Sequence, residues 1–453
     1  MNAPVRLLLV ASATCVALLA LLLLAAPLGI STALVVGSVF LVLCVRFPIV
    51  AWTGYVASFC ANGIGLDIGG AYLQLEMLCL PLLFLAMRGK ASRNGIGSDK
   101  GQLLLLWFGI VLWFGANIAA SLLNAPAPVK SIRIIVLMSC SLAAFTLVRR
   151  LKRSEATRYL VAVVVLLTAY ATSVLLAWGI AQATGRANAL VVLNYGETVY
   201  RTKGFMIEPN LLGSLLLLVM CVLFVARDQI PKALLFCALP VLGAATFLSF
   251  TRAAWVGMVF LALAWTFTGR RATLKATAVA IVGVFSFGVV GAAVSRAGQV
   301  LGATFSDRLS GVFDLGSGTG AYRARIWEVA VSDYFNSSHL LIGLGTNSYS
   351  QRHAAQDTSS GEAYLGNFWI VLVHDSGLLG VVGFLLVSLV IVLRARSLRN
   401  LPLYFALVVT ALATNPMWFA FPWVCLGLIL AMRTPVPVEP DERRGSPNFA
   451  IAA

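Results

Sequence analysis

Arg252 is a lone cation in a long apolar stretch, and this position favours an anion-binding role. Between Lys232 and Arg270 it is the only charged residue, in the run "ALLFCALPVLGAATFLSFTRAAWVGMVFLALAWTFTG". The run is too long for one membrane span, which needs about 20 apolar residues, so it predicts two spans that meet near Arg252. An arginine buried in lipid is costly unless it is paired. We therefore expect Arg252 to have an anionic partner.

A pair of cations, Arg201 and Lys203, precedes the segment "GFMIEPNLLG". Pro209 and Asn210 suit the first turn of the following helix, because a proline there leaves no amide hydrogen unpaired. The N-terminus of a helix carries partial positive charge and binds anions. Basic side chains, Asn210 and a helix N-terminus together predict a phosphate site, which Arg252 at the next turn on the same side would join.

Two further cations, Lys130 and Arg133, lie three residues apart and so share one helix face, where they are candidates for substrate binding. The alternative for any of these cations is pairing with a lipid head group or a carboxylate. The carboxylates expected near the same side are Glu76, Glu208 and Asp375. Each is either the structural partner of an arginine or a base that acts on a hydroxyl.

Several motifs are missing from the sequence. It contains no GxxxxGK[ST] phosphate loop, no HExxH and no carboxylate pair suited to a divalent metal. The eight cysteines lie in apolar stretches without a CxxC spacing, which is typical of buried free thiols. We therefore expect no metal and no cofactor. The substrate should either carry its own activated group or be transported without reaction.

The elements that must position these residues are membrane helices. Of the 453 residues 60% are hydrophobic and 11% are charged, less than half the ordinary charged share of about 25%. The composition predicts an all-α polytopic membrane protein with about 12–14 transmembrane helices, forming one domain over residues 1–432 before a cytoplasmic tail at 433–453. The predicted spans are 7–26, 28–45, 48–66, 71–87, 101–121, 131–148, 159–182, 207–226, 233–250, 253–268, 276–294, 366–393, 401–414 and 416–432.

The distribution of Lys and Arg predicts how the chain is oriented. Alternate loops are rich in cations, as in "RGKASRNGIGSDK", "RRLKRSEATR" and "RARSLRN", and such loops face the cytoplasm. The net charge of +16 therefore reflects membrane topology, and no nucleic-acid partner is expected. An even number of spans places both termini in the cytoplasm. Residues 183–206 and the large loop 295–365 then lie outside, and "RIWEVAVSDYF" within the large loop has the spacing of a short helix.

These residues resemble a known family in their order and spacing. "RTKGFMIEPNLLGSLL" resembles the Arg-x-x-Gly…Pro-Asn motif of bacterial O-antigen ligases and O-antigen or exopolysaccharide polymerases. "LSFTRAAWVGMVF" resembles their Thr/Ser-Arg-x-x-Trp segment, and "YRARIWEVAVSDYFNSSHLLIGLGTNSY" resembles their large periplasmic loop. "GNFWIVLVHDSGLLG" resembles the segment that closes this loop. The resemblance covers residues 200–383.

The resemblance implies a C-type glycosyltransferase architecture in the bacterial inner membrane. Such an enzyme moves an undecaprenyl-diphosphate-linked glycan onto a sugar hydroxyl on the periplasmic side without a metal. The acceptor is a glycan or the lipid A-core, and a chain-length regulator is a candidate partner. Arg201 and Arg252 would then bind the diphosphate and stabilise the leaving group, with Arg325 as a third cation. Asn367 and Asp375 match the closing motif, with Asp375 as a catalytic candidate.

The sequence departs from the ligases at one position. Their histidine before the closing Asn is replaced by Gly366, and His374 lies eight residues later, about 12 Å along a helix. This departure favours a repeat-unit polymerase over a ligase that joins the glycan to lipid A-core. A polysaccharide or lipid transporter is the alternative of another class, although neither internal repeats nor interrupted helices are evident.

Overall fold

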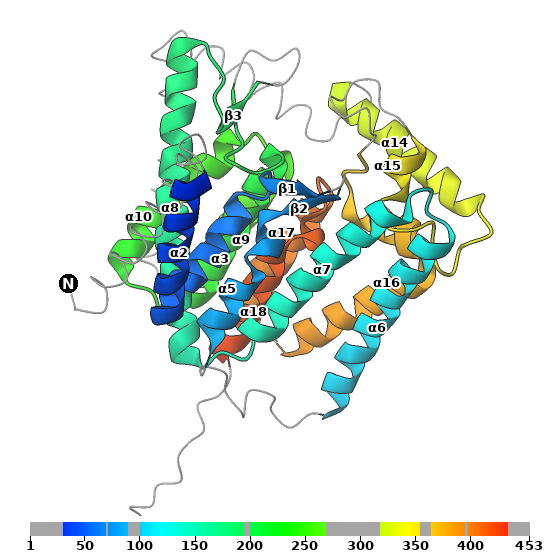
Figure 1. Ribbon diagram of the computed structural model, residues 1–453, viewed down its shortest axis with the longest axis horizontal. Helices are drawn as coiled ribbons and strands as arrows, with labels where there is room; N and C mark the ends of the chain where they lie inside the picture. Colours follow the sequence, from blue (N-terminus) through cyan, green and yellow to red (C-terminus); the bar gives the residue numbers. More distant parts are fainter. Residues whose placement is uncertain are drawn as a thin grey trace, which may run out of the picture.

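The computed structural model describes residues 30–68, 71–88, 100–193, 200–268, 318–353, 364–394 and 397–433. Helices dominate, and most of them run side by side as a bundle with its loops at two ends (Figure 1). Two short antiparallel hairpins, β1–β2 and β3–β4, are added to the predicted all-helical fold.

The bounds of the elements are as follows. The helices are α2 (Ile30–Arg46), α3 (Pro48–Cys60), α4 (Leu75–Leu78), α5 (Leu80–Met87), α6 (Lys100–Leu123), α7 (Pro128–Val148), α8 (Arg153–Thr184), α9 (Pro209–Ala226), α10 (Lys232–Leu248), α11 (Arg252–Thr268), α14 (Gly318–Phe335), α15 (Ser348–Arg352), α16 (Phe368–Arg394), η2 (Leu398–Asn400), α17 (Leu401–Ala411), η3 (Pro416–Trp418) and α18 (Ala420–Arg433). The strands are β1 (Gly65–Ile68), β2 (Ala71–Gln74), β3 (Val191–Val192) and β4 (Arg201–Thr202).

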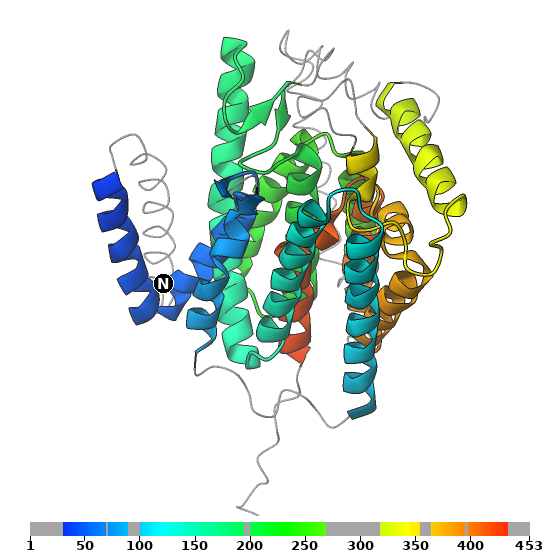
Figure 2. The ribbon, with the colours of Figure 1, turned by 45° about the vertical axis from the view of Figure 1, so that its right-hand side comes forward.

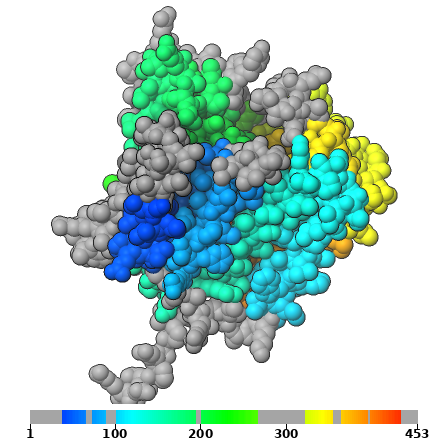
Figure 3. All heavy atoms as spheres, viewed as in Figure 1, coloured from blue at the N-terminus to red at the C-terminus, as the bar shows by residue number. Residues whose placement is uncertain are grey.

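The helices have the character of membrane spans. Five of the described helices, α6, α7, α8, α9 and α16, are long and apolar enough to cross a membrane. Helix α9 is buried along nearly its whole length, while the outer helices expose apolar side chains such as Val111, Leu123 and Leu176. On one face the helices from α2 (blue) to α7 (cyan) lie beside one another (Figure 3). An outer surface of this kind is suited to lipid, so the chain is a multi-pass membrane protein, as predicted.

Among the described residues, the predicted spans agree with the helices except in three places. Non-helical backbone at Gly377 interrupts α16, although no interrupted helix was expected, and the predicted span 416–432 is divided into η3 and α18. The third place is a glycine-rich segment. The spans 48–66 and 71–87 are wrong in part, because α3 ends at Cys60, and residues 65–68 and 71–74 form the paired strands β1 and β2, with Gly65 opposite Gln74. Glycines disfavour a helix, and "ANGIGLDIGG" contains four of them. The expected helix in the large loop is confirmed as α14, which lies beside α16 (Figure 2). The predicted spans 7–26 and 276–294 lie outside the described residues.

The loops expected to share one side of the membrane do meet at one end of the bundle, here called the loop end. Gly63 N donates to Phe205 O at 3.0 Å, which joins the segment after α3 to the segment before α9. Asn124 Nδ2 donates to Gly343 O at 2.8 Å and joins the α6–α7 loop to the loop after α14. The loop end therefore gathers segments that are far apart in the sequence.

The basic loops gather at the opposite end, here called the basic end. Arg399 Nη1 lies 2.7 Å from Asp228 Oδ2, and Arg394 Nε donates to Gln102 Oε1 at 3.1 Å. These contacts join the segments "RARSLRN" and "RDQIPK" and the start of α6. The separation of the two ends agrees with the alternation read from the sequence.

Candidate functional site

The site begins at the turn between α10 and α11, where the predicted pair of spans does meet. Phe250 has a φ of 51°, a left-handed conformation that is uncommon for a bulky residue. The Trp255 indole donates to Phe247 O at 3.0 Å and stacks on the Phe247 ring at 5.2 Å. This packing holds the turn, and Arg252 is the first residue of α11.

Arg201 lies in β4 and is 8% exposed. Its Nε donates to Ser249 O at 3.0 Å, and its Nη2 donates to Asn210 Oδ1 at 3.4 Å. These bonds attach the guanidinium to the α10–α11 turn and to the first turn of α9. Burial lowers the pKa of Arg201 from 12.5 to about 10, which Glu208 opposes. The group stays charged at neutral pH, but its charge is held in a poorly solvated place.

Three arginines converge on this part of the loop end. The charges of Arg323 and Arg252 both act to lower the pKa of Arg201, while Glu208 acts to raise it. The three cations come from β4, α11 and α14, and among the described residues Glu208 is the carboxylate whose charge acts on Arg201. A cluster of like charges that persists in a folded protein is suited to binding an anion of two or more charges.

Glu208 is the carboxylate in this cluster and occupies the N-cap position of α9. The Thr414 hydroxyl donates to Glu208 Oε1, and Asn210 Nδ2 donates to Glu208 Oε2 at 3.4 Å. Burial raises the pKa of the Glu208 carboxyl, whereas the Thr414 hydrogen bond and the charges of Arg323 and Arg201 lower it. Glu208 therefore interacts both with the arginine cluster and, through Thr414, with the segment that follows α17.

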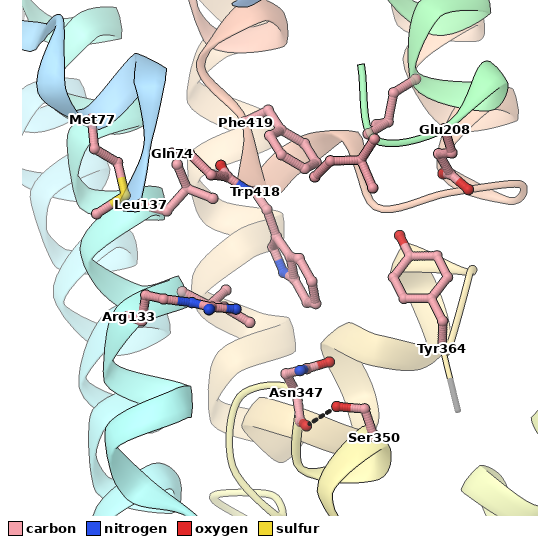
Figure 4. A pocket seen from close by; sticks show the side chains of 13 residues that line it. Gln74, Met77, Arg133, Leu137, Glu208, Asn347, Ser350, Tyr364, Trp418 and Phe419 are labelled. Carbon is pink, nitrogen blue, oxygen red and sulfur yellow. Dashed lines mark hydrogen bonds between the residues drawn. The ribbon is translucent and has the colours of Figure 1, made fainter. Parts of the chain in front are cut away.

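A cavity of about 300 Å³ has Glu208 in its lining (Figure 4). Arg133 projects into it from α7 toward Asn347, and the Tyr364 hydroxyl points toward Glu208. In the part of the chain that the structure describes, the Arg133 guanidinium forms no ion pair or hydrogen bond. The full lining is Gln74, Met77, Arg133, Ile134, Leu137, Ile207, Glu208, Leu211, Asn347, Ser350, Tyr364, Trp418 and Phe419.

Asp375 lies behind one wall of this cavity. Its Oδ2 accepts from Asn347 N at 2.6 Å, and its Oδ1 is 2.8 Å from His374 Nδ1. It is 2% exposed, and both oxygens are engaged by the protein. Gly377 in the same helix has a φ of 60°, and a Cβ there would lie 2.5 Å from Gly343 N. The Asp375 carboxylate therefore fixes the loop that carries Asn347, and its geometry favours a positioning role over the predicted catalytic one.

The remaining candidates lie in separate places. Asn367 caps α16, with Oδ1 accepting from Trp369 N at 3.0 Å, and it does not line the cavity. Arg325 is exposed and lies 6.0 Å from the ring of Tyr322. The arginine of α14 whose charge acts on Arg201 and Glu208 is Arg323, so a role of Arg325 in substrate binding stays a prediction.

The two lysine candidates differ from the arginines in their surroundings. The side chain of Lys203 is half-buried and makes no hydrogen bond to the described residues, while Lys130 is exposed. Of the predicted Lys130–Arg133 pair, only Arg133 reaches the cavity.

Sequence reasoning missed three contributors to the site. Arg323 is two residues from the predicted Arg325, and the packing of α14 decides which of the two interacts with Glu208. Tyr364 and Trp418 lie far from Glu208 in the sequence and gave no local signal. The Tyr364 hydroxyl is 3.4 Å from Thr414 Oγ1, and Trp418 forms part of η3.

Comparisons with known proteins give no independent assignment. A scan against protein-family models and a search of curated proteins each returned no match.

Proposed function

We propose that this protein is an inner-membrane glycosyltransferase that moves an undecaprenyl-diphosphate-linked glycan onto a sugar hydroxyl. The observation that carries the proposal is that Arg201, fixed by hydrogen bonds to Ser249 O and Asn210 Oδ1, interacts electrostatically with Arg252, Arg323 and Glu208. A lipid-linked diphosphate carries the kind of negative charge that a cluster of cations can bind, and it would reach the site from the membrane. The resemblance over residues 200–383 points to the same substrate class.

The arginine cluster would serve both binding and catalysis. When the bond between the sugar and the diphosphate breaks, the diphosphate gains negative charge. Cations that are already fixed in a poorly solvated site stabilise that charge without reorganising. The bonds from Arg201 to Ser249 O and Asn210 Oδ1 supply such fixation.

The proposed orientation places the loop end in the periplasm and the basic end in the cytoplasm. It follows from the excess of Lys and Arg in the loops of the basic end. We extend it to both termini in the cytoplasm, about 12–14 spans and a C-type glycosyltransferase architecture. No cofactor or metal is part of this scheme.

Polymerisation of surface-polysaccharide repeat units is the favoured reaction, because Gly366 stands where ligases have histidine. Deleting the gene separates the two reactions. Loss of a polymerase leaves surface lipid capped with single repeats, whereas loss of a ligase leaves long lipid-linked chains and an uncapped lipid A-core.

The direct test is transfer by the purified protein in liposomes. The substrate is lipid-linked glycan extracted from the deletion strain, and released undecaprenyl diphosphate is measured. We expect release by the natural protein and loss of release in Arg201→Ala and Arg252→Ala, with both variants inserted normally. If the glycan lipid crosses the membrane and no undecaprenyl diphosphate is released, the protein is a transporter and this proposal is wrong.

A further inference from the structure

The cavity beside Glu208 is not part of the proposed diphosphate site. None of Arg201, Arg252 and Arg323 lines it. Glu208 is shared by the cavity and the arginine cluster, so a molecule in the cavity would meet the donor at this carboxylate. We propose that the cavity is the binding site of the acceptor sugar and that Glu208 takes the proton from its attacking hydroxyl. This inference rests on the proposed function and names the site and base of its second substrate.

The wall of the cavity has the mixed character of a carbohydrate site. The Trp418 indole offers a flat apolar surface to the C–H face of a sugar ring. Across from Glu208, the Arg133 guanidinium and the amide of Asn347 can hydrogen-bond to sugar oxygens. A volume of about 300 Å³ is at the lower end of the range for small-molecule sites, which suits the terminal sugar of a longer chain.

Two polar residues on the cavity wall could meet a sugar, one held by the protein and one with an unpaired atom. Asn347 has a φ of 56°, and its backbone N–H is fixed by Asp375 Oδ2 at 2.6 Å. Half-buried Gln74 contributes a buried Oε1 atom that has no hydrogen-bond partner among the described residues. An unpaired buried acceptor is costly, and a sugar hydroxyl in the cavity would satisfy it.

The position of Glu208 meets the geometric needs of a base. Each carboxylate oxygen accepts one bond from the protein, from Thr414 at Oε1 and from Asn210 at Oε2. A carboxylate oxygen has two lone pairs, so each oxygen keeps capacity for a substrate hydroxyl. The charged groups that face it are Arg201 and Arg323, with Arg133 across the cavity and the phenol of Tyr364 beside it.

The proposed step is a single displacement. The acceptor hydroxyl oxygen forms a bond to the anomeric carbon of the donor sugar as the bond from that carbon to the diphosphate oxygen breaks. The leaving undecaprenyl diphosphate keeps the bonding electron pair beside the arginine cluster. The hydroxyl proton passes to the Glu208 carboxylate and is afterwards released to water. No oxidant, reductant or metal is needed.

The test uses Glu208→Gln in the liposome assay together with direct binding of undecaprenyl diphosphate. The amide keeps the shape of Glu208 but cannot accept the proton as a carboxylate does. We expect turnover to fall on the order of 100-fold or more, while undecaprenyl diphosphate binds at least as tightly as it does to the natural protein. A carboxylate that only balanced Arg201 would instead change binding and leave turnover near normal, and that result overturns the proposal.

A second variant tests the cavity without touching the carboxylate. Ser350→Trp should fill the cavity from α15, and its folding is checked by thermal unfolding with Ser332→Trp, on the exposed side of α14, as the control. We expect Ser350→Trp to lose transfer while undecaprenyl diphosphate binding is unchanged. If it transfers normally, or if it loses diphosphate binding, the acceptor does not bind in this cavity. If the natural protein binds no undecaprenyl diphosphate and transfers nothing, the proposed function itself is wrong.

Discussion

Replacing Arg201 by methionine separates the stability of the fold from its proposed function. At about 1.4 kcal/mol per pKa unit, the shift of Arg201 from 12.5 to about 10 means that its charge destabilises the folded state by about 3 kcal/mol. This cost is present at neutral pH and is relieved as pH rises through the lowered pKa. Arg201→Met removes it and keeps most of the apolar length of the side chain.

The same substitution also removes favourable contacts. The hydrogen bonds to Ser249 O and Asn210 Oδ1 are lost, at about 1 kcal/mol each. Asn210 Oδ1 retains the Thr251 hydroxyl at 3.4 Å. Gain and loss nearly cancel, so we expect the ligand-free variant to unfold within about 2 kcal/mol of the natural protein.

Binding of undecaprenyl diphosphate should respond very differently. Removing one buried, hydrogen-bonded cation from a charge pair costs about 2–5 kcal/mol, so the dissociation constant should rise on the order of 100-fold. Thermal unfolding and binding are measured on the same purified samples. The control is Arg186→Met, which removes an exposed cation from the loop end. Unchanged binding in Arg201→Met would refute the diphosphate site, and a large fall in ligand-free stability would refute the argument from burial.

Four further predictions follow from the site. Arg323→Ala should reduce the rate of undecaprenyl diphosphate release at least about 10-fold through loss of one charge-assisted contact. Arg325→Ala, on the exposed side of α14, should release undecaprenyl diphosphate at nearly the natural rate. If Arg325→Ala is the slower variant instead, α14 presents its other face to the site. Burial raises the pKa of Glu208 above the ordinary 4.5, and a general base must be unprotonated to act. The release rate should therefore fall with decreasing pH, with a midpoint above pH 4.5. A midpoint at or below that value would argue against Glu208 as the base. Asp375→Asn should lower the thermal midpoint by loosening Asn347 while leaving diphosphate binding intact, and a loss of binding with normal stability would return Asp375 to a direct role. Gly377→Ala should reduce the folded yield, since its Cβ would lie 2.5 Å from Gly343 N, and a normal yield would show that the loop can move aside.

The sequence by itself determined that the chain is a helical membrane protein and where most helices begin and end. Apolar length and the placement of Lys and Arg are local properties, so the split at Arg252 and the grouping of loops at two ends could be read directly. The pairing of β1 with β2 could not, since both short strands lie in apolar stretches long enough for membrane spans, even though the glycines between them disfavour a helix. Arg201, Arg252 and Glu208 were recognised from their types and positions.

Only the tertiary structure decided which of these groups meet. A helix turns about 100° per residue, so whether Arg323 or Arg325 faces Glu208 depends on how α14 packs, which spacing does not specify. The cavity joins residues from β2, α7, α15 and η3, and no local pattern predicts that Arg133 and Trp418 share it. Asp375 was singled out as a buried charge, but its two hydrogen bonds to the protein became visible only when the loop after α14 was in place. The sequence specifies the sign of each charged side chain, whereas the tertiary packing of helices and loops decides which groups each charge contacts.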